Sequence, residues 1–195
     1  MQDTAAARDR LVSEACAALG DIGLASLTVG AIARRAGVST ALVYYHFDTK
    51  DRLLLAAAAR LAPERTRVRL DALGRRGGLD ALDAMWDALE QGVRAGSERA
   101  WSELLLHATG DRKIAALLAE QRSTELAAIA SGAPALLYGL GANLAVSAEE
   151  FAALLAATLD GLSAALQAGA GAAQVRAAYD AFWLTTISAG QSGRR

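Results

Sequence analysis

Alanine and leucine dominate the apolar residues of this chain, and this bias limits the folds that it can adopt. Alanine alone supplies 48 of the 195 residues, whereas β-branched residues are sparse. Because alanine and leucine rank among the strongest helix formers, the composition predicts an all-α protein. With 53% hydrophobic residues, the chain is long enough to bury the core of one or two small domains.

The chain has too few cysteines and histidines for two classes of stabilising site. Its single cysteine excludes an internal disulfide, and its two histidines lie too far apart in the sequence to form a zinc-binding cluster. We therefore predict no metal, no cofactor and a reducing, cytoplasmic location. The first ten residues carry charges where a signal peptide needs an apolar run, which argues against export.

Residues 126–148 form an uncharged stretch that is long enough to span a bilayer. The stretch contains three glycines, a proline, two serines and an asparagine, and much of the remainder is alanine, which gains little from transfer into lipid. We therefore predict no membrane contact, and interpret this stretch as a helix end followed by a packed connection.

Charge and glycine content divide the chain near residue 78. Residues 1–78 carry 12 basic and 8 acidic side chains, a net charge of +4, and residues 79–195 carry 8 and 13, a net charge of −5. The N-terminal part is therefore the better partner for a polyanion. We expect a domain at 1–60, a linking helix at about 49–73 that ends at the glycine-rich run 74–78, and a second domain at 61–195.

Apolar periodicity and capping residues predict about nine helices. The first spans about 4–22 and ends at Gly23, the second begins after Thr28, and the third begins at Ser39. Further apolar stripes follow residue 78. Ser147 and Glu150 form a capping box that opens a long apolar helix.

The segment 28–53 carries the clearest functional pattern. Two short helices joined at Gly37 have the dimensions of a helix-turn-helix, in which Gly37 takes a positive φ and Val38 fills the angle between the helices. Periodicity turns Val43 and Phe47 of the second helix inward. Small and polar residues at the start of that helix can approach base edges in a major groove, and nearby helix N-termini suit phosphate oxygens.

This segment closely resembles the DNA-binding domain of the tetracycline-repressor (TetR) family of bacterial transcriptional regulators. The matching residues are Thr28, Val29, Ile32, Ala33, Ala36, Gly37, Val38, Ser39, Val43, Tyr44, His46, Phe47, Lys50 and Leu53. The resemblance implies an N-terminal three-helix DNA-binding domain with a helix-turn-helix, followed by a C-terminal helical domain for ligand binding and dimerisation. It also implies a homodimer that pairs through its last two helices.

The resemblance assigns roles to single residues of the N-terminal domain. The residues that would hold phosphates are Thr28, Tyr44, His46 and Lys50, and those that would face bases are Ser39, Thr40, Ala41 and Tyr45. Two departures from the family pattern matter. Asp48 stands where the family often has proline, and the base-reading face lacks Arg, Asn and Gln, so sequence preference depends on Tyr45, Thr40 or DNA shape. Packing is the alternative role for His46, and Cys16 is interpreted as a small core residue.

Large aromatic residues in the alanine-rich second part either line a cavity or fill the core. We expect residues 79–146 to enclose a largely apolar cavity. Its expected lining residues are Trp86, Trp101, Glu103, His107 and Tyr138. The alternative for the Glu103 and His107 pair is a solvated surface position.

The last two helices combine small residues, which allow close approach, with larger apolar residues, and this pattern predicts a dimer face. The expected interface residues are Leu155, Leu159, Leu162, Phe182 and Ile187. Asp160 interrupts the apolar run, and its charge must be satisfied. A hydrogen bond across the subunit interface is the preferred interpretation, with solvent exposure and ligand contact as alternatives.

Together these features predict a homodimeric, sequence-specific DNA-binding transcriptional regulator without enzymatic activity. We expect a repressor whose two reading helices match major grooves about 34–36 Å apart in a pseudo-palindromic operator. A small apolar or amphipathic effector would favour a dimer geometry that no longer fits. The alternatives are a helical small-molecule-binding protein or enzyme that uses the N-terminal helices as scaffold, and a DNA-binding regulator controlled by a protein partner.

Overall fold

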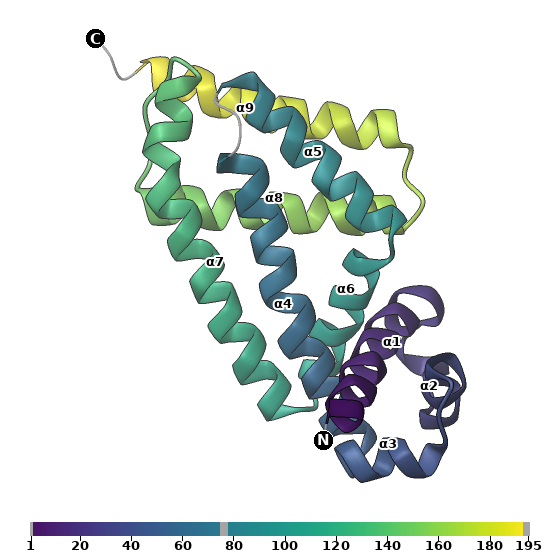
Figure 1. Ribbon diagram of the computed structural model, residues 1–195. Helices are drawn as coiled ribbons and strands as arrows, with labels where there is room; N and C mark the ends of the chain where they lie inside the picture. Colours follow the sequence, from purple (N-terminus) through teal and green to yellow (C-terminus); the bar gives the residue numbers. More distant parts are fainter. Residues whose placement is uncertain (1, 75–77, 193–195) are drawn as a thin grey trace. The chain divides into compact units, whose positions relative to one another are not determined.

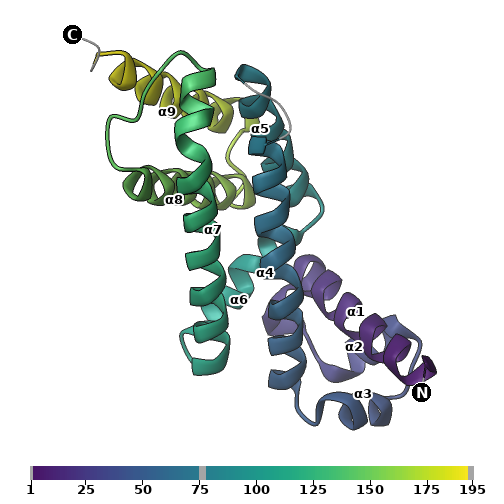
Figure 2. The ribbon, with the colours of Figure 1, turned by 60° about the vertical axis from the view of Figure 1, so that its left-hand side comes forward.

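The computed structural model describes residues 2–74 and 78–192, and within these ranges the chain is all-α, as its composition predicted. The described residues form nine helices, shown in Figures 1 and 2. They are α1 (Gln2–Ser26), α2 (Val29–Ala36), α3 (Thr40–Phe47), α4 (Lys50–Gly74), α5 (Leu79–Arg94), α6 (Ser97–Ala108), α7 (Arg112–Gly139), α8 (Ala148–Gln167) and α9 (Ala172–Ser192).

The chain divides into two compact units, but the division differs from the expected one at residue 60. Unit 1 contains the described residues of Met1–Arg65 together with Arg94–Glu120, and unit 2 contains those of Thr66–Val93 and Gln121–Arg195. The first part of α4 thus belongs to unit 1 and its remainder to unit 2. Sequence periodicity missed the assignment of α6 and the start of α7 to unit 1, because it identifies apolar faces but not the helices that they meet.

Unit 1 is built on a core shared by helices that lie far apart in the sequence. Its fully or almost fully buried side chains include Leu11, Leu19, Ile32, Phe47, Leu53, Trp101, Leu104 and Ile114. The closest approach joins α1 to the start of α6, where a Cβ atom on Gly20 would lie only 2.6 Å from the carbonyl oxygen of Gly96. Glycine at position 20 therefore lets the two backbones touch.

The helix-turn-helix forms as its capping residues predicted. Thr28 accepts a hydrogen bond from the Ala31 amide at 3.1 Å, and Ser39 accepts one from the Leu42 amide at 3.2 Å. Gly37 has the left-handed conformation, with φ +67° and ψ 34°. The end of the first helix is less simple than expected: Gly23 interrupts it with φ +72° and ψ 169°, and helical residues continue to Ser26.

In unit 2, α8 and α9 run back along each other (Figure 1). The core of this unit contains a cluster of aromatic side chains around Tyr179. The Tyr179 hydroxyl donates to the Leu82 carbonyl at 2.6 Å, and its ring lies 5.5 Å from that of Trp86 and 6.2 Å from that of Trp183. Burial raises the pKa of Tyr179 well above its usual value, so the hydroxyl remains a donor across the physiological range.

The capping box and the uncharged stretch that were predicted around the start of α8 both form. The capping box is present, because Ser147 accepts from the Glu150 amide at 3.2 Å and Glu150 accepts from the Ser147 amide at 2.9 Å. The uncharged stretch 126–148 is the end of α7 followed by a connection to α8. Among the described helices, none combines the length and apolar character that a membrane span requires.

Asp160 is satisfied within its own chain, which corrects the expectation of a bond across a subunit interface. Arg69 donates to both Glu125 and Asp160 at 3.1 Å. Arg122 donates to the same two carboxylates, reaching Glu125 at 2.8 Å. The four side chains, from α4, α7 and α8, form a closed ring of alternating charge, which is the arrangement that permits ionised groups to be buried.

Candidate nucleic-acid interface and apolar cavities

The exposed face of α3 carries residues predicted to contact bases, together with Tyr44, which was predicted to contact a phosphate. Thr40 and Ala41 are exposed at its N-terminus, and Tyr44 and Tyr45 follow with exposed fractions of 53% and 75%. The opposite face is buried, since Phe47 and its neighbour one turn earlier belong to the core of unit 1. Unit 1 therefore presents a short helix whose outer surface is small, polar and aromatic.

Three helix N-termini around this face are capped by hydroxyl side chains. Thr28, Ser39 and Thr49 each accept a hydrogen bond from an amide of the first turn that follows. Accepting that bond leaves each hydroxyl hydrogen available for a phosphate oxygen, and the helix dipoles favour negative charge at the same places. Lys50, half-buried directly after Thr49, adds a positive charge.

His46 is less accessible than a phosphate contact requires. Its Nε2 atom is buried and has no hydrogen-bond partner among the described residues, and its ring meets the Tyr45 ring edge-on at 5.2 Å. The structure thus favours the alternative role of packing, in which His46 supports the exposed Tyr45. Resemblance alone cannot detect this difference, because the same residue type serves either role.

The two arginines at the end of α2, Arg34 and Arg35, are both exposed but differ in their ion pairs. Arg35 donates to Asp21 at 2.8 Å and to Glu14 at 3.2 Å, and these hydrogen bonds raise its pKa. The pairs hold α2 to α1. Arg34 is exposed as well, but among the described residues it forms no such ion pair.

Asp48 occupies a strained turn between α3 and α4. Its φ of +61° and ψ of −46°, with a Thr49 amide bonded to the Phe47 carbonyl at 2.6 Å, describe a classic γ-turn. Proline, which the family that this segment resembles often has at this position, cannot adopt a positive φ. The carboxylate lies 3.2 Å from Arg52, which offsets its repulsion of a nearby phosphate.

We predict that Asp48→Gly stabilises the protein by about 1 kcal/mol, because glycine adopts positive φ without the steric cost of a side chain. Asp48→Ala is the matched control, since it removes the same carboxylate but keeps the strain. Urea denaturation measures both free energies of unfolding. An equal effect of the two substitutions would show that the charge, and not the turn, determines the result.

The five residues predicted to line one ligand cavity are not brought together, and this expectation is corrected. Trp86 lies in the core of unit 2, whereas Trp101, Glu103 and His107 belong to unit 1. Tyr138 is 74% exposed on α7. Helical periodicity placed the two tryptophans on apolar faces but could not tell that these faces serve different cores.

The predicted ligand residues of unit 1 have structural partners. The Arg65 guanidinium lies 4.7 Å from the centroid of the Trp101 ring. Glu103 lies beside Gly23, and the Nε2 atom of His107 is 3.9 Å from Asp51. Cys16 packs against the core of unit 1, as expected. Burial raises the pKa of its thiol to about 11 and keeps it protonated.

Unit 2 contains an apolar cavity of about 470 Å³, called here the α4–α7 cavity. Residues from the end of α4, from α7 and from the start of α8 form its wall. They are Leu70, Leu73, Gly74, Gly78, Ala128, Ile129, Gly132, Ala133, Ala135, Leu136 and Phe151. The lining offers no charged side chain and a single aromatic ring. Sequence reasoning missed this site because small alanines and glycines, rather than large aromatics, create its space.

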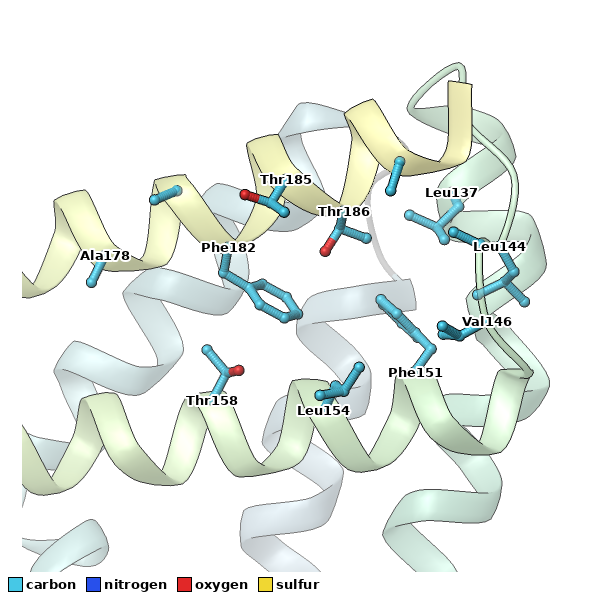
Figure 3. Close-up of a pocket in the computed structure, with 13 residues that line it drawn as sticks. Leu137, Leu144, Val146, Phe151, Leu154, Thr158, Ala178, Phe182, Thr185 and Thr186 are labelled. Atoms are coloured by element: carbon cyan, nitrogen blue, oxygen red, sulfur yellow. The ribbon is translucent and has the colours of Figure 1, made fainter. Parts of the chain in front are cut away.

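A second hollow of about 510 Å³ runs between α8 and α9 and is called here the α8–α9 groove. Figure 3 shows the rings of Phe151 and Phe182 pointing into it from the two helices, with Thr158 and Thr186 nearby. Leu154, which is 53% exposed, also lines it. The groove lining carries no charged side chain.

Three of the residues predicted to form a dimer face are buried in their own chain. Leu155 and Leu159 are fully buried and Leu162 is 8% exposed, so the helix face that they share packs inside unit 2. Phe182 and Ile187 are half-buried. The apolar pattern of α8 was read correctly, but these three leucines serve the core, and the outer face of the helix carries Leu154 together with smaller residues.

Comparison with known proteins identifies the N-terminal part of the chain. Residues 11–61, which contain the helix-turn-helix, match the family described as bacterial regulatory proteins, tetR family. The N-terminal domain belongs to the tetR family. Within 54 residues the chain is 43% identical to the HTH-type transcriptional regulator BetI of Rhizobium meliloti (strain 1021), a match that spans 28% of this chain and 27% of that regulator.

Solved structures extend the likeness of this chain beyond the matched domain. A transcriptional regulator from Rhodococcus sp. Rha1 has a TM-score of 0.71 and 27% identity, covering 95% of this chain and 96% of its own. A regulator from Saccharomonospora viridis in complex with choline has a TM-score of 0.73 and 21% identity, covering 91% and 95%. These relatives share the fold, and each is described as a transcriptional regulator rather than an enzyme.

Proposed function

We propose that this protein is a homodimeric, DNA-binding transcriptional repressor that a small uncharged apolar molecule releases from a pseudo-palindromic operator in the cytoplasm. The observation that carries the proposal is the outer face of α3, with Tyr44 and Tyr45 exposed between hydroxyl-capped helix N-termini. A face of this kind suits a major groove flanked by phosphates.

Base recognition on this face depends on few groups. Thr40 offers a hydroxyl and Tyr45 a ring and a hydroxyl, while Ala41 permits close approach and can contact a thymine methyl. Lys50 and Tyr44 hold the sugar–phosphate backbone. Phosphate contacts set affinity on all sequences, whereas base contacts set preference.

We predict that Tyr45→Ala changes the sequences selected from a random DNA pool, with a smaller effect on binding to unselected DNA, because its exposed side chain faces the bases. Lys50→Gln should instead weaken binding to all duplexes and lower the salt dependence of log K by about 0.9. Selection followed by sequencing and salt-titrated anisotropy provide the measurements. Identical selected sequences for Tyr45→Ala and the wild type would contradict this docking.

The α8–α9 groove is the proposed dimer face in place of the buried leucines. It is open and apolar, and Leu154, Thr158, Ala178, Ala181 and Thr185 present small or exposed side chains along two neighbouring helices. Small residues allow helices of a second copy to approach closely, and the absence of charge in the lining removes a desolvation cost.

We predict that Leu154→Arg yields a folded monomer, because it places a charge in the apolar contact between copies. Leu106→Arg is the control, since Leu106 is 70% exposed in unit 1, outside the groove. Sedimentation velocity at micromolar protein measures the outcome. A Leu154→Arg protein that sediments as the wild-type dimer does would exclude this face. Leu162→Arg would be a poor test, because Leu162 lies in the core and its replacement would unfold unit 2.

The α4–α7 cavity is the proposed effector site. Leu70 and Leu73 of its wall belong to α4, the helix that also begins directly after the reading helix, so an occupant can bias the position of this helix. The Saccharomonospora viridis regulator was solved with choline. The cavity here has no carboxylate and only one ring, Phe151, and so lacks the groups that stabilise a quaternary ammonium. An uncharged apolar effector suits it better.

We predict that Gly132→Leu fills the cavity and weakens binding of the uncharged fluorescent probe N-phenyl-1-naphthylamine by at least about tenfold. A Cβ atom on Gly132 meets open space, so the larger side chain can be accommodated. Ala127→Leu, on the exposed side of the same helix, is the matched control. Equal probe affinity in the two variants would contradict the assignment of the effector site to this cavity.

A further inference from the structure

A charged cleft lies beside the candidate DNA interface, entirely within unit 1. Its volume is about 540 Å³, and it is formed where the start of α4 meets the connection between α6 and α7. The lining residues are Thr49, Asp51, Arg52, Leu55, Asp111, Arg112 and Lys113. Thr49, which caps α4 in front of Lys50, therefore shares a cleft with two cations that lie some sixty positions later in the sequence.

One of the two acidic side chains of this cleft is engaged in local hydrogen bonds. Asp111 accepts hydrogen bonds from the amides of Lys113 and Ile114 at 2.8 and 3.2 Å, and these bonds hold its pKa below the usual range. Asp51 is 69% exposed and lies 3.9 Å from the Nε2 atom of His107, which has no hydrogen-bond partner among the described residues. Asp111 is thus the carboxylate that has partners of its own.

The cations at the start of α7 are less engaged, although the charge of Lys113 contributes to the lowered pKa of Asp111. Arg112 and Lys113 are exposed, and within the part of the chain that the structure describes neither forms an ion pair or a hydrogen bond from its side chain. Arg52 pairs with Asp48 at 3.2 Å but is also largely exposed. Long cationic side chains that stay free beside hydroxyl and lysine groups suit phosphate oxygens.

We infer that Arg112 and Lys113 form a second phosphate-contacting site, which binds the backbone of the same DNA duplex next to the phosphate held by Thr49 and Lys50. This inference rests on the proposed function. It adds to the DNA interface a segment from far outside the helix-turn-helix and outside residues 11–61, which match the family. Neither sequence charge nor resemblance pointed to it, since residues 79–195 carry net negative charge.

The test measures binding of a fluorescein-labelled duplex of random sequence, because phosphate contacts act on any sequence. Anisotropy titrations over a range of KCl concentrations compare the wild type with Arg112→Gln and Lys113→Gln. Each substitution should lower the slope of −log K against log[KCl] by about 0.9 and weaken binding roughly eightfold at about 0.1 M salt. Arg112→Lys should retain the wild-type slope. Circular dichroism checks that every variant is folded.

Two controls separate this inference from the proposed function. Arg67→Gln removes one exposed positive charge from unit 2 and should leave the slope unchanged, which excludes an effect of net charge. Lys50→Gln should lower the slope by the same amount as the cleft variants. If Lys50→Gln lowers the slope and the Arg112 and Lys113 variants do not, the second site is disproved and the proposed interface stands. If none of the three changes the slope, the proposed interface itself is disproved.

Discussion

The burial of Arg65 between Glu98 and Trp101 is the interaction on which the arrangement of unit 1 depends. Its guanidinium bonds both carboxylate oxygens of Glu98, at 2.9 and 3.1 Å, and stacks on the indole ring. A buried bidentate pair of this kind loses several kcal/mol if one partner is removed, so it fixes the geometry between α4 and α6 firmly. Because α6 is held in this way, the start of α7 follows it into unit 1, and the free cations there come to lie beside the first turn of α4.

Local chemistry determined what the sequence could predict. The helix-turn-helix depends on contacts within four residues, such as Thr28 with the Ala31 amide and the positive φ of Gly37, and these signals can be recognised without a structure. The same holds for the Ser147 capping box. The exposed tyrosines of α3 followed from periodicity within one short helix whose inner face was unambiguous.

The packing partners of the helices were not predictable, because apolar periodicity does not specify which other helix an apolar face packs against. Trp86 and Trp101 satisfy the same helical pattern, yet each fills a different core. Asp160 shows the same limit for charge. Its need for a partner was evident, but Arg69 and Arg122 lie on two other helices, and only the folded chain shows that they reach Asp160. Cavities were the hardest feature to predict, since small residues shape the space around Gly132 by what they leave unfilled.

The contact between Gly20 and Gly96 limits how this chain can evolve or be engineered. A side chain at position 20 would collide with the Gly96 backbone, and Gly96 itself has a φ of +77°. A side chain at position 20 therefore requires α1 and the start of α6 to move apart, and a residue other than glycine at position 96 is strained by the positive φ. Libraries that diversify the exposed face of α3 leave this contact and the buried Phe47 intact. Randomising either glycine would instead produce mostly misfolded members, whose changed behaviour would report folding defects rather than new specificity.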